Sequence, residues 1–282
     1  MLKKLLKQEY KATGRFFLPA YAIFAALLVI ERLSMLAATN LVKAGDLVGQ
    51  IAGIFVGLFT AVTVLGLIVM ILSPFIYATV RFYRNMLGDE GYLMHTLPVT
   101  ASQHIWAKLL TAGSWEVITV LVMAAYGSIF FLTVDPAQTA AFFQGLGDLF
   151  AQGFQAVGAW MILLILLMLA ALLLQMGHNL LSLYSAMSIG QTAAKHKLLA
   201  SAATYLGIQF ATASLLQILG LSMVLNAGQW WIRFTEEGLP TNSLICRYVC
   251  ILLLIVCLIN ALLGALHFFL GRHMLTKKLN LA

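Results

Sequence analysis

The chain has 282 residues, of which 62% are hydrophobic and only 10% are charged, and its formal net charge is +7. The mean hydropathy is +0.95. A soluble domain of this length covers its surface with charged side chains, so this composition excludes an ordinary water-soluble fold. The apolar residues form long runs that match bilayer thickness and lack the alternation of barrel strands. Because backbone polar groups in hydrocarbon must pair within their own segment, the sequence predicts an all-α, polytopic membrane protein.

The first fifteen residues predict an amphipathic helix at the membrane interface. Leu2, Leu5 and Leu6 lie at helical spacing among several lysines. A cleaved signal peptide is the alternative interpretation. The apolar run that follows is about 20 residues long, which suits a membrane span, and no convincing small-residue cleavage site comes after it. We therefore expect this segment to remain and to lie on the membrane surface.

Six apolar runs follow, and they predict six transmembrane helices in one membrane domain that covers residues 1–282. Pro74 in the second run is expected to bend that helix or to start a new helical piece. An even number of spans places both termini on one side of the membrane. The predicted spans cover about residues 16–38, 51–80, 105–134, 156–187, 202–225 and 244–270.

The basic residues are distributed unequally between the two sides. Of the 17 Lys and Arg residues, 13 fall on the side of the termini, and the other four are Arg32, Lys43, Arg233 and Arg247. The positive-inside rule therefore predicts cytoplasmic N and C termini. We interpret the positive charge as a consequence of topology that faces anionic lipid, and not as a nucleic-acid-binding surface.

Enzyme motifs are missing from the sequence. It contains no phosphate-binding loop, no HExxH zinc pair, no GxSxG elbow and no aspartate-rich magnesium cluster. Its three cysteines, Cys246, Cys250 and Cys257, all lie in the sixth predicted span. There they are expected to pack as small apolar residues, since no His or acidic residue stands at ligand spacing beside them. We therefore expect no catalytic residue, metal site or cofactor in this chain.

The cytoplasmic connection between the second and third spans, residues 81–104, is the most distinctive polar stretch. Two arginines follow the second span, two glycines bracket Asp89 and Glu90, and an apolar cluster precedes Pro98. This order predicts a short helix on the membrane surface that offers one face to a partner. A charged turn with interfacial aromatic residues is the alternative.

The stretch GDEGYLMHTLPV, residues 88–99, resembles the permease subunits of ABC-2-type ATP-binding cassette transporters, particularly those of Gram-positive bacteria. The N-terminal LLKQEYKATGRFFLPAY, the stretch SLYSAMSIGQTAAKHK at 182–197 and the basic tail are weaker likenesses, and together they extend the resemblance over essentially the whole chain. The resemblance implies a bacterial plasma-membrane protein in which two permease subunits, the same or related, pair with two cytosolic ATPases. Those partners would bind ATP and Mg.

In the resembling family, the connection between the second and third spans docks into the ATPase as a coupling helix. The residues that this implies for the coupling segment are Arg81, Arg84, Asp89, Glu90, Gly91, Tyr92, Leu93 and Pro98. A second cytoplasmic loop, residues 188–197, is either another contact with that partner or a solvated basic turn. On the outer side, Trp230 and Trp231 predict an aromatic belt, and the resemblance offers an interfacial or re-entrant helix there instead.

Polar residues inside the predicted spans are candidates for function, because burying them in hydrocarbon is unfavourable. Glu116 is the acidic residue deepest in the third span. Spans four and six carry polar stripes at helical spacing that we expect to face protein. We hypothesise that Glu116, His178 and His267 converge, either lining an inner vestibule or locking three spans together. The candidate intramembrane residues are Glu116, Gln175, His178, Asn179, Asn260 and His267.

The resemblance, together with the apolar membrane core, implies a permease subunit that exports an amphipathic peptide, a lipid-like molecule or a hydrophobic drug, driven by a separate ATPase. A membrane scaffold or sensor without transport, and an enzyme working inside the membrane, are the alternatives. An enzyme would turn over its substrate without ATP. A scaffold would bind its partner without stimulating ATP hydrolysis.

Overall fold

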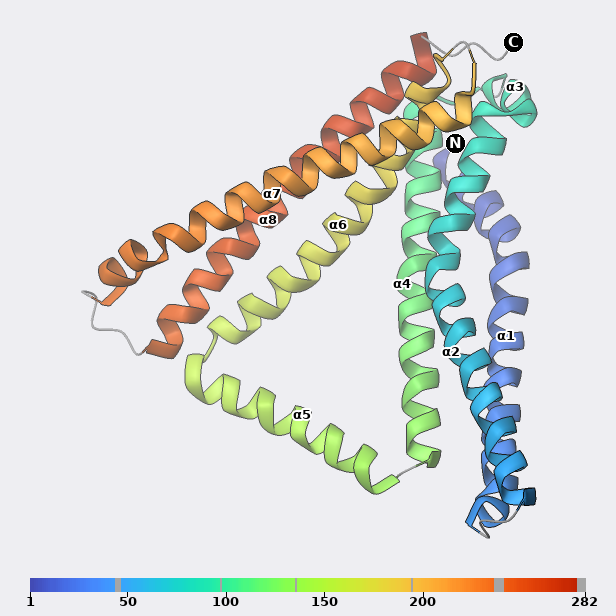
Figure 1. The fold of residues 1–282 in the computed structure, drawn as a ribbon. Coiled ribbons are helices and arrows are strands. Elements are labelled where there is room, and N and C mark those ends of the chain that lie inside the picture. The colour runs from blue at the N-terminus through green and yellow to red at the C-terminus, as the bar shows by residue number, and fades with distance from the viewer. Residues whose placement is uncertain (44–46, 97, 135, 194, 236–240, 278–282) are drawn as a thin grey trace. The chain divides into compact units, whose positions relative to one another are not determined.

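The computed structural model describes residues 1–43, 47–96, 98–134, 136–193, 195–235 and 241–277. Each regular element in this part of the chain is a helix (Figure 1). Long apolar runs form helices because the helix satisfies its own backbone hydrogen bonds. The elements are α1 Leu2–Lys43, α2 Leu47–Phe82, the π-helix η1 Tyr83–Leu87, α3 Asp89–His95, α4 Ala101–Val134, α5 Pro136–Val157, α6 Trp160–Gly190, α7 Lys197–Thr235 and α8 Thr241–Lys277.

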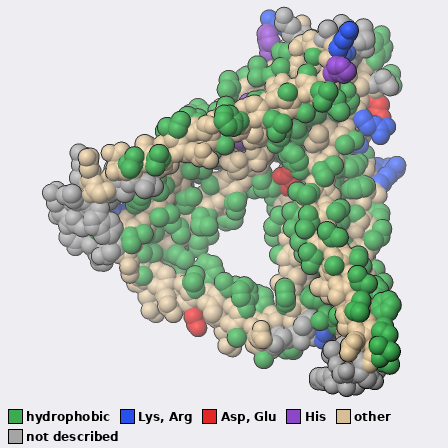
Figure 2. Space-filling view, in the orientation of Figure 1, with side chains coloured by type: hydrophobic (Ala, Val, Ile, Leu, Met, Phe, Trp, Pro, Cys, Tyr) green, Lys and Arg blue, Asp and Glu red, His purple; other side chains and the backbone are tan. Residues whose placement is uncertain are grey.

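Six helices in the described part of the chain are long and apolar enough to cross a membrane, as the sequence predicts. Hydrophobic side chains are spread along the helices in the space-filling view, and charged side chains are few (Figure 2). The fold is therefore all-α and polytopic. The segments that meet these criteria are Leu2–Ala38, Leu47–Leu87, Ala101–Leu132, Trp160–Gly190, Lys197–Ser222 and Asn242–Lys277.

Helix boundaries differ from the sequence prediction at several places. The amphipathic start belongs to α1, which continues without interruption into the first span, and its interfacial position stays a prediction. Pro74 lies inside the continuous helix α2 and does not start a new one. Helix α7 extends to Thr235, so Trp230 and Trp231 belong to its last turns, whereas Glu236 and Glu237 lie outside the described residues.

Helix α5 occupies most of the stretch between the third and fourth predicted spans. It begins at Pro136, where a proline suits the first helical turn because that turn has no partner for its N–H groups. It ends before Gly158, whose φ of +58° suits a left-handed helix cap. The amide of Gly158 donates to the carbonyl of Phe154 at 2.9 Å. As a consequence, α6, which holds most of the fourth predicted span, begins at Trp160, and residues 156 and 157 belong to α5.

The chain divides into two compact units. Unit 1 comprises Met1–Ala78 and Leu110–Leu146, and unit 2 comprises Thr79–Leu109 and Gly147–Ala282. The prediction of a single permease domain stays a prediction. The core of unit 1 is aromatic: Phe17 stacks on Trp115 with ring centroids 4.8 Å apart, and Phe24 stacks on Tyr126 at 6.1 Å. In unit 2, α6 packs against both α7 and α8.

Candidate functional site

The segment between α2 and α4 forms a short helix, which polar contacts hold to the residues just before it. Helix α2 first widens into the π-helix η1, closed by a bond from the Gly88 amide to the Tyr83 carbonyl at 2.8 Å. Helix α3 follows. The Arg84 guanidinium lies 3.7 Å from the Glu90 carboxylate. In the amide orientation that satisfies both of its groups, Asn85 donates to Glu90 at 3.0 Å and to the Arg81 carbonyl at 3.1 Å. Glu90 thus ties α3 back to η1.

The outward face of α3 carries two large exposed side chains. Tyr92 and Leu93 are each 69% exposed, whereas Gly91 is buried and Pro98 is exposed beyond the end of the helix. The side chain of Asp89 lies outside the described residues. Of the residues predicted for coupling, Arg81, Arg84 and Glu90 therefore belong to the base of the segment, and Tyr92 and Leu93 form its free face.

Aromatic contacts seat both ends of this segment on the helices of unit 2. The Phe82 ring, at the end of α2, stacks on Tyr184 of α6 with centroids 4.1 Å apart and planes 7° from parallel. At the start of α4, Trp106 packs on Phe268 of α8 at 5.4 Å. Phe82 and Tyr184 are both buried. These two contacts join the segment to α6 and α8.

A polar seam runs between α6 and α8, where the two predicted stripes meet. Ser185 and His267 are joined by an Oγ–Nδ1 contact of 3.0 Å. Because the Ser185 hydroxyl also donates to the Ser182 carbonyl at 2.9 Å, we infer that Nδ1 of His267 carries the proton and donates to Ser185. Gly264 packs over the backbone of His178, where a Cβ atom would lie 3.9 Å from the His178 Cα.

Two members of the seam have polar atoms without a partner. The His178 ring is 1% exposed and neither nitrogen is hydrogen-bonded, although its centroid lies 5.4 Å from that of His267. The Asn260 side chain is equally buried; its amide donates to the Val256 carbonyl at 3.0 Å, and its Oδ1 has no partner. Gln175 and Asn179 bond to each other at 3.1 Å along α6. A role for these residues in a substrate path stays a prediction.

Glu116 belongs to unit 1, whereas His178 and His267 belong to unit 2. Glu116 is half-buried on α4, beside the buried Trp115. The hypothesis that these three residues converge therefore stays untested. Among the residues that the structure describes, no group of three or more His, Cys, Asp and Glu side chains gathers closely enough for a metal ion. Cys246, Cys250 and Cys257 are free thiols.

Helices α6 and α7 approach each other closely where the chain connects them. The backbone of Gly190 packs directly on Ser201, so that a Cβ atom at Gly190 would lie 2.5 Å from the Ser201 nitrogen and 2.6 Å from its Cα. His196 precedes α7 with a φ of +56°, a conformation uncommon for residues other than glycine. Lys195 and His196 are exposed. Both predicted interpretations of this loop, partner contact and solvated basic turn, remain open.

Sequence reasoning missed the residues that seat the coupling segment and join the seam. Phe82, Tyr184 and Trp106 look like ordinary apolar residues of membrane helices, and no spacing in the sequence singles them out. Ser185 was part of a predicted polar stripe, but the sequence did not indicate that it bonds His267. A structure is needed to pair residues that lie 82 positions apart.

The fold and the candidate site define an all-helical, multi-pass membrane protein with a short, exposed helix between its second and third spans. The chain matches no protein-family model, no curated protein and no solved structure.

Proposed function

We propose that the chain is a permease subunit of an ATP-driven ABC transporter, and that α3 docks into a separate cytosolic ATPase. The observation that carries this proposal is the contrast within one segment: Tyr92 and Leu93 are exposed, whereas both ends of the segment are seated on α6 and α8 through aromatic rings. A partner that moved α3 would thereby move two membrane helices.

The face of α3 has the chemistry of a small docking surface. An aromatic side chain beside an aliphatic one is typical of the few residues that dominate binding at protein interfaces. Helices of seven residues are not stable in isolation, and the contacts of Glu90 with Arg84 and Asn85 favour one conformation of this face before binding. Preorganisation of this kind suits a part that must transmit force.

The direction and cargo of transport are part of the proposal. The helices carry few charges within their apolar lengths, which suits an amphipathic peptide, a lipid-like molecule or a hydrophobic drug better than a small ion. We propose export across a bacterial plasma membrane, with both termini cytoplasmic and a second permease subunit, the same or related, completing the transporter. ATP and Mg would bind to the ATPase and not to this chain.

The proposal is tested by mild purification of the full-length, tagged protein and identification of what co-purifies. We expect a near-stoichiometric ATPase with a phosphate-binding loop. Replacing both Tyr92 and Leu93 by Ala should weaken its binding at least about tenfold, because interface anchors commonly contribute more than 1.4 kcal/mol. ATP hydrolysis coupled to the permease should fall in parallel.

A matched control is Leu262→Ala, since Leu262 on α8 is 70% exposed and lies in a predicted membrane span. This variant should retain the ATPase. If no ATPase accompanies the wild-type protein in several mild detergents, the transporter proposal is wrong. If an ATPase binds but its activity never responds to the permease, the chain is better described as a membrane scaffold or sensor.

A further inference from the structure

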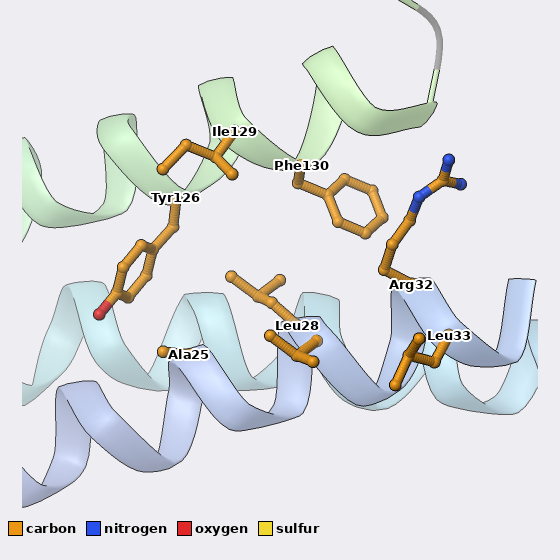
Figure 3. A pocket seen from close by; sticks show the side chains of 8 residues that line it. Ala25, Leu28, Arg32, Leu33, Tyr126, Ile129 and Phe130 are labelled. Atoms are coloured by element: carbon orange, nitrogen blue, oxygen red, sulfur yellow. The ribbon is translucent and has the colours of Figure 1, made fainter. Parts of the chain in front are cut away.

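An apolar cleft opens between α1 and α4 within unit 1 (Figure 3). Leu28, Val29 and Arg32 line it from α1, and Tyr126, Ile129 and Phe130 line it from α4. Its volume is about 280 Å³. This is near the lower limit of about 300 Å³ for typical small-molecule sites, so the cleft has room for part of one acyl chain and not for a large ligand.

Bonds on one side of the cleft hold the two helices in register. Tyr21 and Thr119 share a hydrogen bond of 2.7 Å between their hydroxyls. The Tyr126 hydroxyl donates to the Tyr21 carbonyl at 3.4 Å, and Tyr126 is also the residue at which the cleft begins. The cleft is therefore preformed, because the contacts that set the helix spacing lie beside it and do not depend on a ligand.

Arg32 is the one charged side chain among the described residues that line the cleft. Figure 3 shows it reaching from α1 to the side of Phe130, with the guanidinium group at one end of the apolar lining. The neighbouring Glu31 is buried and does not line the cleft. The site thus has an apolar body and a cationic end, and an amphiphile with a negative headgroup has the complementary chemistry.

The position of Arg32 along α1 agrees with the level of lipid headgroups. Arg15 and Arg32 are 17 residues apart on one continuous helix, or about 26 Å along its axis. The hydrocarbon core of a bilayer is about 30 Å thick, so arginines at these two positions extend their side chains to opposite interfaces. Arg32 is thus placed where a phosphate group would lie when an acyl chain fills the cleft.

We propose that this cleft binds an anionic phospholipid of the bilayer, with one acyl chain between Leu28 and Ile129 and the phosphate at Arg32. The site belongs to unit 1 and uses none of the residues of the α3 segment. It therefore stands or falls independently of the transporter proposal.

Native mass spectrometry of the full-length protein tests the proposal. The protein is titrated in detergent with dioleoylphosphatidylglycerol or with dioleoylphosphatidylcholine, which have the same chains. We expect retention of phosphatidylglycerol at lower concentration. Arg32→Gln should weaken this binding about fivefold, the effect of one basic residue at a membrane surface, and should weaken phosphatidylcholine binding less, because the choline cation offsets the charge of its phosphate. Arg15→Gln, on the same helix at the other interface, is the matched control and should bind as the wild type does.

A second pair of variants tests the apolar part of the site. Leu28→Trp should fill the cleft and reduce retention of both lipids, whereas Ile23→Trp, at an exposed position of α1 outside the lining, should not. Val29→Trp replaces Leu28→Trp if the latter fails to fold. The proposal is overturned if Arg32→Gln binds phosphatidylglycerol like the wild type, or if Arg15→Gln weakens it equally. It is also overturned if filling the cleft changes the fraction of dimers and not lipid retention, because the occupant would then be a second copy of the chain.

Discussion

Ser185 and His267 contact each other at 3.0 Å across the seam between α6 and α8, whereas His178, one ring away from His267, has no hydrogen-bond partner. Two histidines that look equivalent in the sequence therefore have different roles in packing. His267 joins two helices, and His178 buries a polar ring without compensation. Unpartnered buried polar groups are destabilising by roughly 1–3 kcal/mol.

This difference predicts opposite effects of the same substitution. His267→Phe should lower the thermal unfolding midpoint in detergent, since it removes an interhelical bond of about 0.6 kcal/mol, the average for membrane proteins. His178→Phe should leave the midpoint unchanged or raise it, because no bond is lost and a buried polar group is removed. A larger loss for His178→Phe than for His267→Phe would contradict this expectation and would show that His178 has a partner in solution.

Two glycines should respond differently to alanine. A Cβ atom at Gly190 would overlap the Ser201 backbone, whereas at Gly264 it would lie 3.8 Å from the nearest atom, a Leu181 methyl carbon. Gly190→Ala should therefore lower the free energy of unfolding by about 1–3 kcal/mol through overpacking. Gly264→Ala should leave the free energy of unfolding unchanged or raise it by up to about 1 kcal/mol, because alanine has the higher helix propensity. Denaturant titration of purified protein measures both, and equal losses would argue against the turn geometry at Gly190.

The buried bond from Trp115 Nε1 to Thr13 Oγ1, 2.7 Å long, links α1 and α4 in unit 1. Thr13→Val should lower the free energy of unfolding by about 1–3 kcal/mol, because the indole N–H is then buried without an acceptor. The double variant, Thr13→Val with Trp115→Phe, should lose less free energy of unfolding than the two single variants together, since no unpaired donor remains. Thermal unfolding of the four proteins gives the coupling energy.

The control for this cycle is Tyr10→Phe. Its hydroxyl bonds Ser114 at 2.7 Å in an exposed position, where water replaces the lost partner. We expect the free energy of unfolding to change by less than about 0.5 kcal/mol, which is typical of substitutions at exposed sites. Additive effects of the Thr13 and Trp115 variants would show that the bond contributes nothing to the stability of unit 1.

Helix α5 should lie in the membrane interface. Phe142, Leu146, Phe150 and Phe154 recur at four-residue spacing and are all exposed, and residues 144, 148, 152 and 155 on the other face are polar. The tryptophan that Phe150→Trp adds should therefore fluoresce and be quenched by brominated phospholipids, because an amphipathic helix buries its apolar face among acyl chains. Gln152→Trp, on the polar face, should be quenched much less. Equal quenching would mean that α5 is not oriented by the membrane.

The sequence predicted the class of protein and its six spans. These depend on the length and polarity of single segments, which bilayer thickness constrains directly. Helix α5 was not predicted from the sequence. Its glycine and glutamine residues lower the hydropathy, although its apolar residues keep helical spacing. The start of α1 continues into the first span, which local charge does not reveal, and its position at the membrane interface stays a prediction.

The tertiary structure decided which residues meet. Polar stripes on spans four and six were visible in the sequence, but the bond between Ser185 and His267, the isolation of His178 and the stacking of Phe82 on Tyr184 were not. Membrane helices are all surrounded by similar apolar material, so hydrophobicity does not select their partners. Partner choice depends on the rotation and spacing of helices far apart in the sequence. The sequence by itself thus determined the segments that cross the membrane, and only tertiary packing decided the contacts and the cleft between them.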